Sequence, residues 1–215
     1  MTSAGRWSFD HVATLVAADL PRDSCVNLGI GLPTLVARHL PEASGVILHS
    51  ENGIVGLRGL GEGEVTDLHV IDAGKQPVGL VRGAAIVDHE DSFTLIRGGR
   101  LDVGVLGAFE VSERGDLASW ILSGEELGSV GGAMDIAVGA RRIVVMMRHV
   151  DRRGWSKLVR KCHNPLTAAG CVRRVYTDLA VIDVESTGCR VKRLAPGMTL
   201  QELQRITAVH LASEA

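Results

Sequence analysis

The 215-residue sequence predicts an α/β fold, in which an open and mostly parallel sheet carries helices on both faces. Two observations lead to this fold class. Short apolar runs recur along the chain, and they are continuously apolar rather than alternating, which is typical of strands covered on both faces. Since no repeat, low-complexity tract or linker-like stretch divides the chain, residues 1–215 are expected to form one domain.

The first predicted elements are a helix, a strand and a second helix. Apolar residues of the segment 8–20 share one helical face, and Ser8 can cap its beginning. Residues 25–28 are expected to form a short strand, followed by a glycine-rich turn. Because Pro33 suits the first position of a helix, a helix is expected over residues 34–40.

The remaining elements are mainly strands, expected in the apolar runs 46–48, 78–81, 103–106, 143–147 and 179–184. Near the end of the chain, Thr199 and Glu202 have the spacing of a capping box, so a helix is expected to begin there. An open parallel sheet binds its ligands at the carboxyl ends of the strands. We therefore expect the residues after strands 25–28 and 46–48 to share one ligand-binding edge.

Composition and charge argue against several classes of function. A formal net charge of −2 gives no general attraction to nucleic acid or to a membrane surface. The sequence has neither an apolar stretch of membrane-spanning length nor the apolar core of a signal peptide, so a cytoplasmic location is expected. The four cysteines form no Cys-x-x-Cys pair and are expected to be reduced thiols. The histidines lack ligand spacing, so no metal site is expected.

Glu51 lies at an unusual place, between the apolar run 46–48 and the dipeptide Asn52-Gly53. Asn-Gly readily takes positive φ, so the chain is expected to bend sharply just after the carboxylate. The simplest interpretation is a solvated glutamate beside a hairpin turn. A carboxylate at a strand end can also act as a covalent nucleophile, provided that fixed N–H donors meet the developing oxyanion.

Two glycine clusters could supply such donors. Gly29 and Gly31 precede the expected helix 34–40, where backbone amides can point at an anion; a packing turn explains them equally well. Gly131-Gly132 brings the backbone close to either a ligand or a neighbouring element. Neither cluster matches a dinucleotide fingerprint or a phosphate-binding loop.

The segment 141–161 is strongly basic, with eight Arg or Lys residues and one acid, Asp151. Such a run is usually a solvated face of the protein. A phosphate-bearing ligand or an acidic partner is the more specific interpretation, and the sequence leaves both open.

Several motifs together resemble the B subunit of 3-oxoacid CoA-transferases, particularly the 3-oxoadipate (succinyl-CoA) and acetoacetate-type enzymes. The motifs are "VNLGIGLPT", "SENGIVG", "DAGK", "DSFTLIRGG", "GGAMD" and "CVRRVYTDLAV", in the order and spacing of that family. The resemblance extends from about residue 8 to residue 208. The most specific part is Ser-Glu-Asn-Gly following Gly-x-Gly-x-Pro.

The resemblance implies a role for each matched residue. Glu51 matches the family's glutamate nucleophile, and Lys75 matches a residue placed near CoA. Oxyanion or substrate positioning is implied for Asn27, Gly29, Gly31, Asn52, Gly131 and Gly132. The implied fold is the open sheet shared with ribose-5-phosphate isomerase-like proteins. CoA is implied as a substrate carrier rather than a tightly bound cofactor, and an A-type subunit is implied as the partner in a hetero-oligomer.

The implied reaction is ping-pong transfer of CoA from an acyl-CoA such as succinyl-CoA to a 3-oxoacid, either 3-oxoadipate or acetoacetate, through a glutamyl-CoA thioester on Glu51. Two alternatives stay open: hydrolysis of acyl-CoA at the same glutamate, and a non-catalytic relative that only binds CoA or another ligand. The chain departs from the family pattern at Arg100, Ser129, Arg148, His163 and Asn164. These departures leave the choice of acid and the partner contact open.

Overall fold

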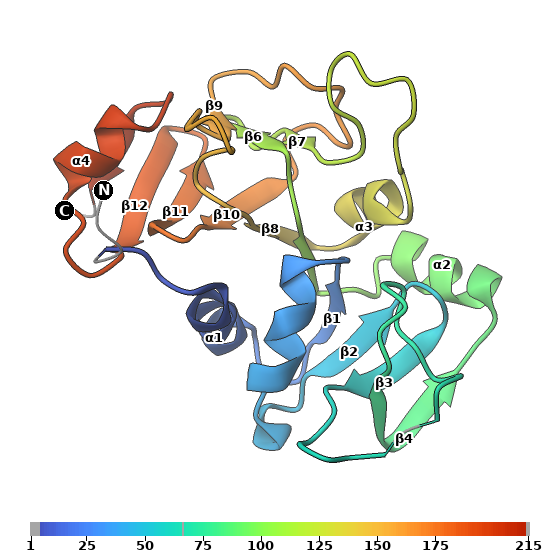
Figure 1. The fold of residues 1–215 in the computed structure, drawn as a ribbon. Coiled ribbons are helices and arrows are strands. Elements are labelled where there is room, and N and C mark those ends of the chain that lie inside the picture. The colour runs from blue at the N-terminus through green and yellow to red at the C-terminus, as the bar shows by residue number, and fades with distance from the viewer. Residues whose placement is uncertain (1–4, 66, 214–215) are drawn as a thin grey trace.

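The computed structural model describes residues 5–65 and 67–213, and Figure 1 shows their arrangement. A ten-stranded sheet forms the centre of the structure, with the strand order β13-β12-β11-β10-β8-β5-β1-β2-β3-β4. Its strands are β1 (Cys25–Leu28), β2 (Ile47–Ser50), β3 (Ile54–Arg58), β4 (Gly79–Ile86), β5 (Val103–Leu106), β8 (Arg142–Met146), β10 (Val172–Tyr176), β11 (Ala180–Glu185), β12 (Gly188–Leu194) and β13 (Leu211–Ser213). The helices are α1 (Phe9–Asp19), α2 (His89–Arg97), α3 (Ala133–Gly139) and α4 (Leu200–Arg205), with 3-10 helices η1 (Leu32–His39) and η2 (Glu42–Ser44).

The middle of the sheet is parallel and its flanks are mixed. Strands β10, β8, β5, β1 and β2 pair in parallel, one after the other. On one flank β3 and β4 are antiparallel, and on the other β11 and β12 are antiparallel while β13 is parallel to β12. The predicted α/β class with a mostly parallel sheet is therefore confirmed.

Helices cover both faces of this sheet, as predicted. Successive residues of a strand point to opposite faces, and β8 divides accordingly. Ile143 and Val145 pack in the same apolar cluster as the buried residues of α2, α3 and α4. Val144 and Met146 pack in the cluster that holds the buried residues of α1 and η1. Figure 1 shows α2 and α3 close together, and the two helices contact each other.

Most of the predicted elements are present near their expected bounds. Strands β1 and β5 match the predicted runs, β8 is displaced by one residue, and β2 begins one residue later and ends two residues later than predicted. Ser8 accepts a hydrogen bond from the His11 amide at the start of α1. Thr199 and Glu202 form the predicted capping box of α4.

One expectation was wrong, because the run 78–81 is not covered on both faces, and two other elements take a form that the sequence left open. The helix after Pro33 is a 3-10 helix rather than an α-helix, because the Thr34 amide bonds to Gly31, three residues back. The run 78–81 belongs to β4, which is the edge strand of the sheet and is mostly exposed rather than covered on both faces. The run 179–184 belongs to β11, which pairs antiparallel with both of its neighbours.

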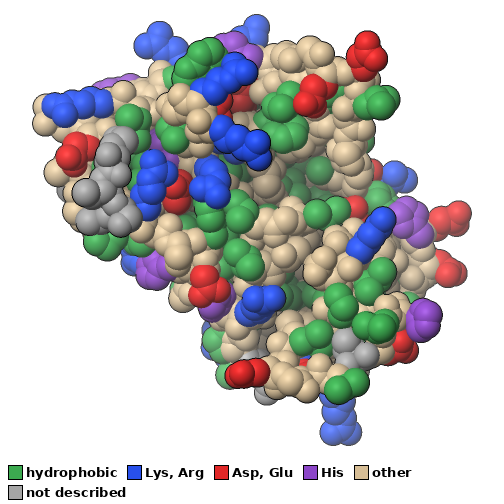
Figure 2. All heavy atoms as spheres, in the orientation of Figure 1, with side chains coloured by type: hydrophobic (Ala, Val, Ile, Leu, Met, Phe, Trp, Pro, Cys, Tyr) green, Lys and Arg blue, Asp and Glu red, His purple; other side chains and the backbone are tan. Residues whose placement is uncertain are grey.

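A second sheet of three strands lies above the C-terminal half of the first one in Figure 1. It consists of β6 (Glu110–Ser112), β7 (Leu117–Ala118) and β9 (Leu158–Val159), in the order β7-β6-β9. The basic segment 141–161 begins in the buried strand β8 and ends beyond β9, so it does not form one face. Lys157 is half-buried and donates to the Ala108 carbonyl, and burial lowers its pKa to about 8. Figure 2 shows Lys and Arg side chains on this part of the surface.

Candidate functional site

The candidate site lies at the carboxyl ends of the parallel strands β1 and β2. Asn27 of β1 pairs with His49 of β2, so the segments that follow the two strands emerge side by side. Gly29–Gly31 follows β1, and Glu51 follows β2. The expectation that these segments share one edge of the sheet is therefore confirmed.

Glu51 begins the tight turn that connects β2 to the antiparallel strand β3. The Gly53 amide closes the turn by donating to the Ser50 carbonyl at 3.0 Å. Gly53 has φ of 113°, and a Cβ atom there would lie 2.2 Å from the Val87 carbonyl oxygen. Only glycine fits both conditions, which explains why the bend predicted after Glu51 forms at this dipeptide.

The Glu51 carboxylate meets the second glycine cluster. The Gly132 amide donates to Glu51 Oε1 at 3.3 Å, although the two residues are 81 positions apart in the chain. A Cβ atom at Gly132 would lie 2.3 Å from Glu51 Oε2, so any larger residue would displace the carboxylate. A Cβ atom at Gly131 would lie 3.7 Å from Oε1. The structure thus brings Glu51, Gly131 and Gly132 together.

The glycines after β1 contribute differently. The Gly29 amide donates to the Val105 carbonyl at 2.8 Å, so its N–H group belongs to the sheet and does not point at Glu51. A Cβ atom at Gly29 would lie 3.1 Å from the Leu106 side chain. Gly31 is exposed with φ of 91°, and its carbonyl accepts from the Thr34 amide and hydroxyl. These two glycines shape the turn into η1.

Asn27 turns its side chain into the interior, where it starts a buried row of hydrogen bonds. Its Nδ2 lies 3.1 Å from His49 Nδ1 and donates to the His49 carbonyl at 3.2 Å. His49 Nε2 lies 3.0 Å from Ser92 Oγ on α2, and Ser92 Oγ donates to the Glu51 carbonyl at 2.8 Å. Burial lowers the pKa of His49 to about 4, so its imidazole is neutral at pH 7.

Lys75 lies at the tip of a tight loop that is tied to the Glu51 turn. The Lys75 amide donates to the Asp72 carbonyl at 2.9 Å, and Lys75 adopts φ of 62°, which is rare for a residue with a side chain. Asn52 Nδ2 donates to the Ile71 carbonyl at 2.7 Å. The Ala73 amide donates to Ser50 Oγ at 2.9 Å. These two bonds bring the loop that carries Lys75 to the turn that carries Glu51.

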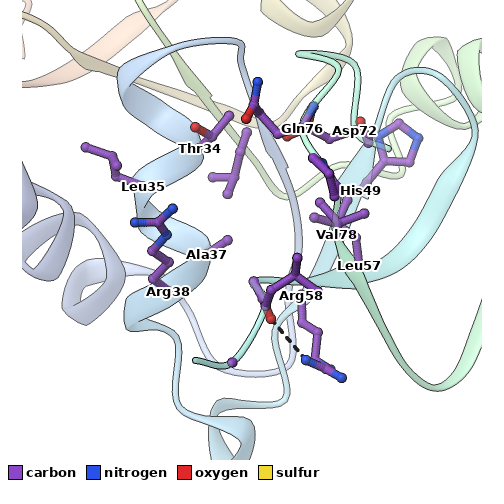
Figure 3. Close-up of a pocket in the computed structure, with 16 residues that line it drawn as sticks. Thr34, Leu35, Ala37, Arg38, His49, Leu57, Arg58, Asp72, Gln76 and Val78 are labelled. Atoms are coloured by element: carbon purple, nitrogen blue, oxygen red, sulfur yellow. Dashed lines mark hydrogen bonds between the residues drawn. The ribbon is translucent and has the colours of Figure 1, made fainter. Parts of the chain in front are cut away.

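A cavity of about 400 Å³ lies between this loop, η1 and the hairpin of β2 and β3. Figure 3 shows Thr34, Arg38 and Gln76 among the side chains that line it. His49 and Ser50, the two residues before Glu51, also line it. Sequence reasoning missed this cavity, because its lining comes from segments with no common motif.

Sequence reasoning also gave no role to His49, Ser92 or Phe93. Ser92 and Phe93 belong to the motif "DSFTLIRGG", which points to a family resemblance but to no role for either side chain. A Cβ atom at Gly132 would lie 3.1 Å from the Phe93 ring, so this ring lies against the same glycine as the carboxylate. The signal that could have indicated His49 is its polar side chain directly after the apolar run 46–48, whereas nothing around Ser92 in the sequence marks that residue.

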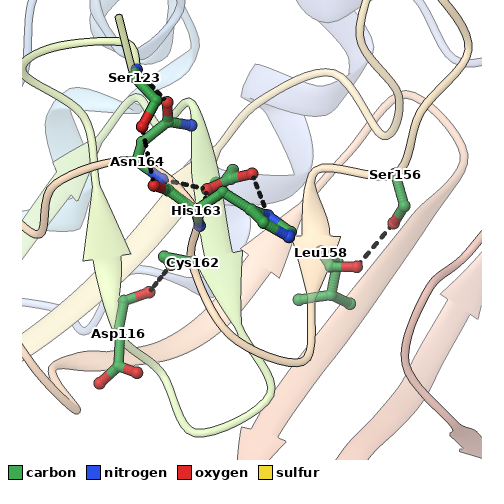
Figure 4. Close-up of polar contacts among 8 residues, drawn as sticks. Asp116, Ser123, Ser156, Leu158, Cys162, His163 and Asn164 are labelled. Carbon is green, nitrogen blue, oxygen red and sulfur yellow. Dashed lines mark hydrogen bonds and ion pairs between the residues drawn. The ribbon is translucent and has the colours of Figure 1, made fainter.

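The positions that depart from the family pattern lie elsewhere. Asn164 Oδ1 accepts from the Ser123 amide at 2.8 Å, and the His163 carbonyl accepts from the Ser123 hydroxyl at 3.0 Å (Figure 4). The Ser129 amide donates to the Trp120 carbonyl within the loop that leads to Gly131. Arg148 stacks over the Phe9 ring of α1 at 5.0 Å. Arg100 is exposed, directly after α2.

The four cysteine thiols and the possible metal ligands are further reactive groups of the described residues. Within residues 5–65 and 67–213, no cluster of His, Cys, Asp or Glu side chains could hold a metal ion. All four cysteines are free, and burial raises the pKa of the Cys25 and Cys171 thiols to about 11. In the described ranges, no helix combines the length and the apolar character needed to cross a membrane.

Comparisons with known proteins match nearly the whole chain. The sequence profile described as Coenzyme A transferase matches residues 9–205. The B subunit of a 3-oxoadipate CoA-transferase from Pseudomonas putida is 47% identical over 212 residues, which cover 98% of this chain and 99% of the relative. The B subunit of a succinyl-CoA:3-ketoacid coenzyme A transferase from Helicobacter pylori is 41% identical over 194 residues, covering 89% of this chain and 92% of the relative.

Solved structures show the same fold at lower identity. The apoenzyme of the acyl-CoA transferase YdiF from Escherichia coli O157:H7 superposes with a TM-score of 0.76 at 22% identity. The superposition covers all of this chain but only 43% of the YdiF chain, so this chain spans less than half of that enzyme's length.

Proposed function

Because this chain belongs to the coenzyme A transferase family, we propose that it is the nucleophile-bearing subunit of an enzyme that transfers CoA from succinyl-CoA to a 3-oxoacid, 3-oxoadipate or acetoacetate. The observation that carries the proposal is the contact between Glu51 and the Gly132 amide. It joins the carboxylate at this strand end to a fixed N–H donor from a distant segment. The choice of substrates rests on the names of the relatives, which are a 3-oxoadipate and a succinyl-CoA:3-ketoacid transferase.

The reaction begins at the Glu51 carboxylate. One oxygen attacks the thioester carbonyl of the acyl-CoA, the C–S bond breaks, and the products are an acyl-glutamyl anhydride and CoA thiolate. The thiolate then attacks the glutamyl carbonyl carbon and expels the first acid as its carboxylate, which leaves a glutamyl-CoA thioester. The carboxylate of the 3-oxoacid reverses both steps and leaves as the new acyl-CoA. Carboxylate attack gives an anhydride, through which CoA can pass to the enzyme, whereas a serine or cysteine nucleophile would take up the acyl group itself as an ester or a thioester.

The Gly132 amide has a defined role in these reaction steps. When the thiolate attacks the glutamyl carbonyl, negative charge develops on a glutamyl oxygen, and the amide already lies 3.3 Å from Oε1. One well-placed donor of this kind contributes about 10²–10³ to the rate. Gly131 lies beside it, while Gly29, Gly31 and Asn52 hold the surrounding turns, and Lys75 offers a cation to the phosphates of CoA.

A partner subunit completes the proposed enzyme. Both relatives carry the name of a B subunit, and this chain spans only 43% of the YdiF chain, so an A-type subunit is proposed to supply the rest of the CoA site. We expect the purified chain to show no exchange by itself and to gain it when an A-type subunit is added. Exchange at full rate by this chain alone would contradict the two-subunit proposal.

The decisive experiment detects CoA on Glu51. The assembled enzyme is incubated with succinyl-CoA without acceptor and digested at mildly acidic pH, which preserves thioesters. Mass spectrometry is expected to find CoA on the peptide from His49 to Arg58, and borohydride is expected to remove it. Glu51→Ala should abolish the adduct and the exchange.

The same experiment separates the alternatives. An adduct on Glu62 or Glu64, or exchange that survives Glu51→Ala, would contradict the proposal. Free CoA released without any acceptor would indicate a hydrolase, and the absence of both adduct and turnover in an assembled complex would indicate a relative that only binds its ligand.

A further inference from the structure

The buried hydrogen bonds behind Glu51 end on its backbone, and the proposed chemistry does not use them. Asn27, His49 and Ser92 are 1%, 1% and 0% exposed, so these side chains contribute nothing to the surface. They come from β1, β2 and α2, the three elements that surround the base of the turn. The row ends where Ser92 Oγ donates to the Glu51 carbonyl at 2.8 Å.

With the Asn27 amide oriented as in the structure, the contacts of this row give each proton one place, although the buried Asn27 Oδ1 is left without a partner. Ser92 has a single hydroxyl proton, and it is used at the Glu51 carbonyl, so His49 Nε2 at 3.0 Å must be the donor to Ser92 Oγ. His49 Nδ1 is then the acceptor, and the Asn27 amide nitrogen at 3.1 Å donates to it. A second Asn27 proton reaches the His49 carbonyl. The direction of donation is therefore the same along the whole row, from β1 to the nucleophile's own peptide.

The Glu51 peptide has little room to move. On one side the Glu51 carboxylate faces Gly132, where no room exists even for a methyl group. On the other side Gly53 lies against the Val87 carbonyl, which also excludes a Cβ atom. Within the turn, the Gly53 amide holds the Ser50 carbonyl. The Ser92 hydroxyl is the side-chain donor that fixes the peptide carbonyl between these two contacts.

We propose that Ser92 and His49 are positioning residues: Ser92 holds the Glu51 peptide through its carbonyl, and His49 holds the Ser92 hydroxyl, so that the carboxylate stays at the Gly132 amide. This inference rests on the proposed role of Glu51 as the nucleophile. Both side chains are buried, and in this proposal they act through the backbone of Glu51. Loss of either should slow attack by the carboxylate and leave binding of the acyl-CoA nearly unchanged.

The test compares Ser92→Ala with Ser24→Ala in the complex with an A-type subunit. Ser24 is the matched control, because it is also buried and its hydroxyl also donates to a backbone carbonyl, that of Pro21, at 2.6 Å. The readouts are kcat, KM for acyl-CoA and the single-turnover rate of adduct formation on Glu51. Since a misplacement of about 1 Å can cost about 10²-fold, Ser92→Ala is expected to slow adduct formation by about 10–100-fold with KM within about threefold.

His49 is tested by two replacements. His49→Leu removes the donor to Ser92 and is expected to slow adduct formation as Ser92→Ala does. His49→Gln keeps an N–H group at the distance of Nε2 and is expected to restore most of the rate. The double variant should be no slower than the slower single variant, because both changes act on one carbonyl. Amide hydrogen exchange at Gly53 is expected to be faster in Ser92→Ala than in Ser24→Ala.

The outcomes separate this inference from the proposed function. If Glu51→Ala retains the adduct and the exchange, the proposed function itself is wrong. If Glu51→Ala is inactive while Ser92→Ala forms the adduct at the rate of Ser24→Ala, the positioning role is wrong. A Ser92→Ala variant that loses rate and thermal stability only to the extent of Ser24→Ala, with no rescue by His49→Gln over His49→Leu, would likewise overturn it.

Discussion

Two segments meet at the Glu51 carboxylate, and they are held in opposite ways. The turn after β2 rests on buried side chains, since Asn27, His49 and Ser92 are almost fully enclosed. The loop that delivers Gly131 and Gly132 runs over the surface, and residues 122–131 are all exposed. Its supports are contacts such as those of Ser123 with Asn164 and of Ser129 with Trp120.

The difference shows that the two halves of the site are held by different parts of the structure. Glu51 is placed by the core of this chain, so its position is decided when the sheet folds. The glycine loop is placed by polar contacts at the surface, which are individually weak. Leu127 in this loop is 89% exposed. We therefore expect the loop to depend on what covers it in the assembled enzyme, and the turn to be independent of it.

The largest loss of exchange activity should come from filling the space between the Glu51 carboxylate and Gly132. Gly132→Ala places a methyl group 2.3 Å from Glu51 Oε2, so the carboxylate or the loop must move. We expect the exchange rate to fall by about 10²-fold with the fold intact. Gly61→Ala is the control, because its added methyl would meet only ordinary contact at 3.5 Å from Glu64. Equal rates for the two variants would show that the carboxylate is not confined at Gly132.

Acid should weaken the buried turn and not the exposed loop. Burial lowers the pKa of His49 from 6.5 to about 4. Its contribution to stability is complete above pH 6.5 and is lost as the pH falls, because the unfolded chain takes up the proton first. Near pH 4 the loss reaches about 3 kcal/mol. His149, whose pKa burial also lowers to about 4, adds a loss of the same direction.

Denaturant unfolding at pH 7 and pH 4.5 measures this loss. In His49→Gln the contribution of His49 is removed while those of His149 and of the carboxyl groups with lowered pKa remain, so the drop in unfolding free energy should be clearly smaller than in the unsubstituted chain. An identical drop in both would mean that His49 is not held neutral by the turn.

A smaller effect on kinetics is expected from substituting Lys75. This substitution tests whether the loop that is bonded to the Glu51 turn contacts CoA. Lys75→Ala should raise the KM for acyl-CoA by about fivefold and leave the KM for the free acid unchanged, since an exposed cation contributes up to about 1 kcal/mol to binding an anion. Lys75→Arg keeps the charge and serves as the control. Steady-state kinetics with each substrate varied in turn would contradict a CoA contact if both KM values rose together.

The smallest loss of activity should come from weakening the contact between Ser123 and Asn164, which supports the exposed loop far from Glu51. Asn164→Ala removes the acceptor of the Ser123 amide, and we expect a loss of about twofold in kcat and no change in adduct position. Asn52→Ala breaks a bond of similar length to the Ile71 carbonyl on the other side and gives the matched comparison. A drop of tenfold or more in Asn164→Ala would mean that the loop is held more tightly than its exposure indicates.

The sequence predicted the parts of the site that depend on local chemistry. The bend at Asn52-Gly53, strand β1 and the edge shared by Glu51 and the turn after β1 follow from patterns within a few residues, and the structure confirms them. The contact between Glu51 and Gly132 joins residues 81 positions apart, so local patterns could suggest two clusters but not their meeting.

Other features depend on packing, which a single sequence does not show. The proposed role of Ser92 could be inferred only from the contact between α2 and the Glu51 turn. The edge position of β4 requires the strand order, because an apolar run reads the same at the centre and at the edge of a sheet. The sheet use of the Gly29 amide likewise depends on register with β5.

The left-handed conformation of Lys75 has a consequence for engineering this protein. A residue with a side chain at φ of 62° costs about 1 kcal/mol relative to glycine, so Lys75→Gly should relieve backbone strain and raise the melting temperature. The same change removes the cation proposed to meet CoA. A selection for thermal stability alone would therefore enrich a variant with weaker substrate affinity, and any thermostable library of this chain needs an activity filter at position 75.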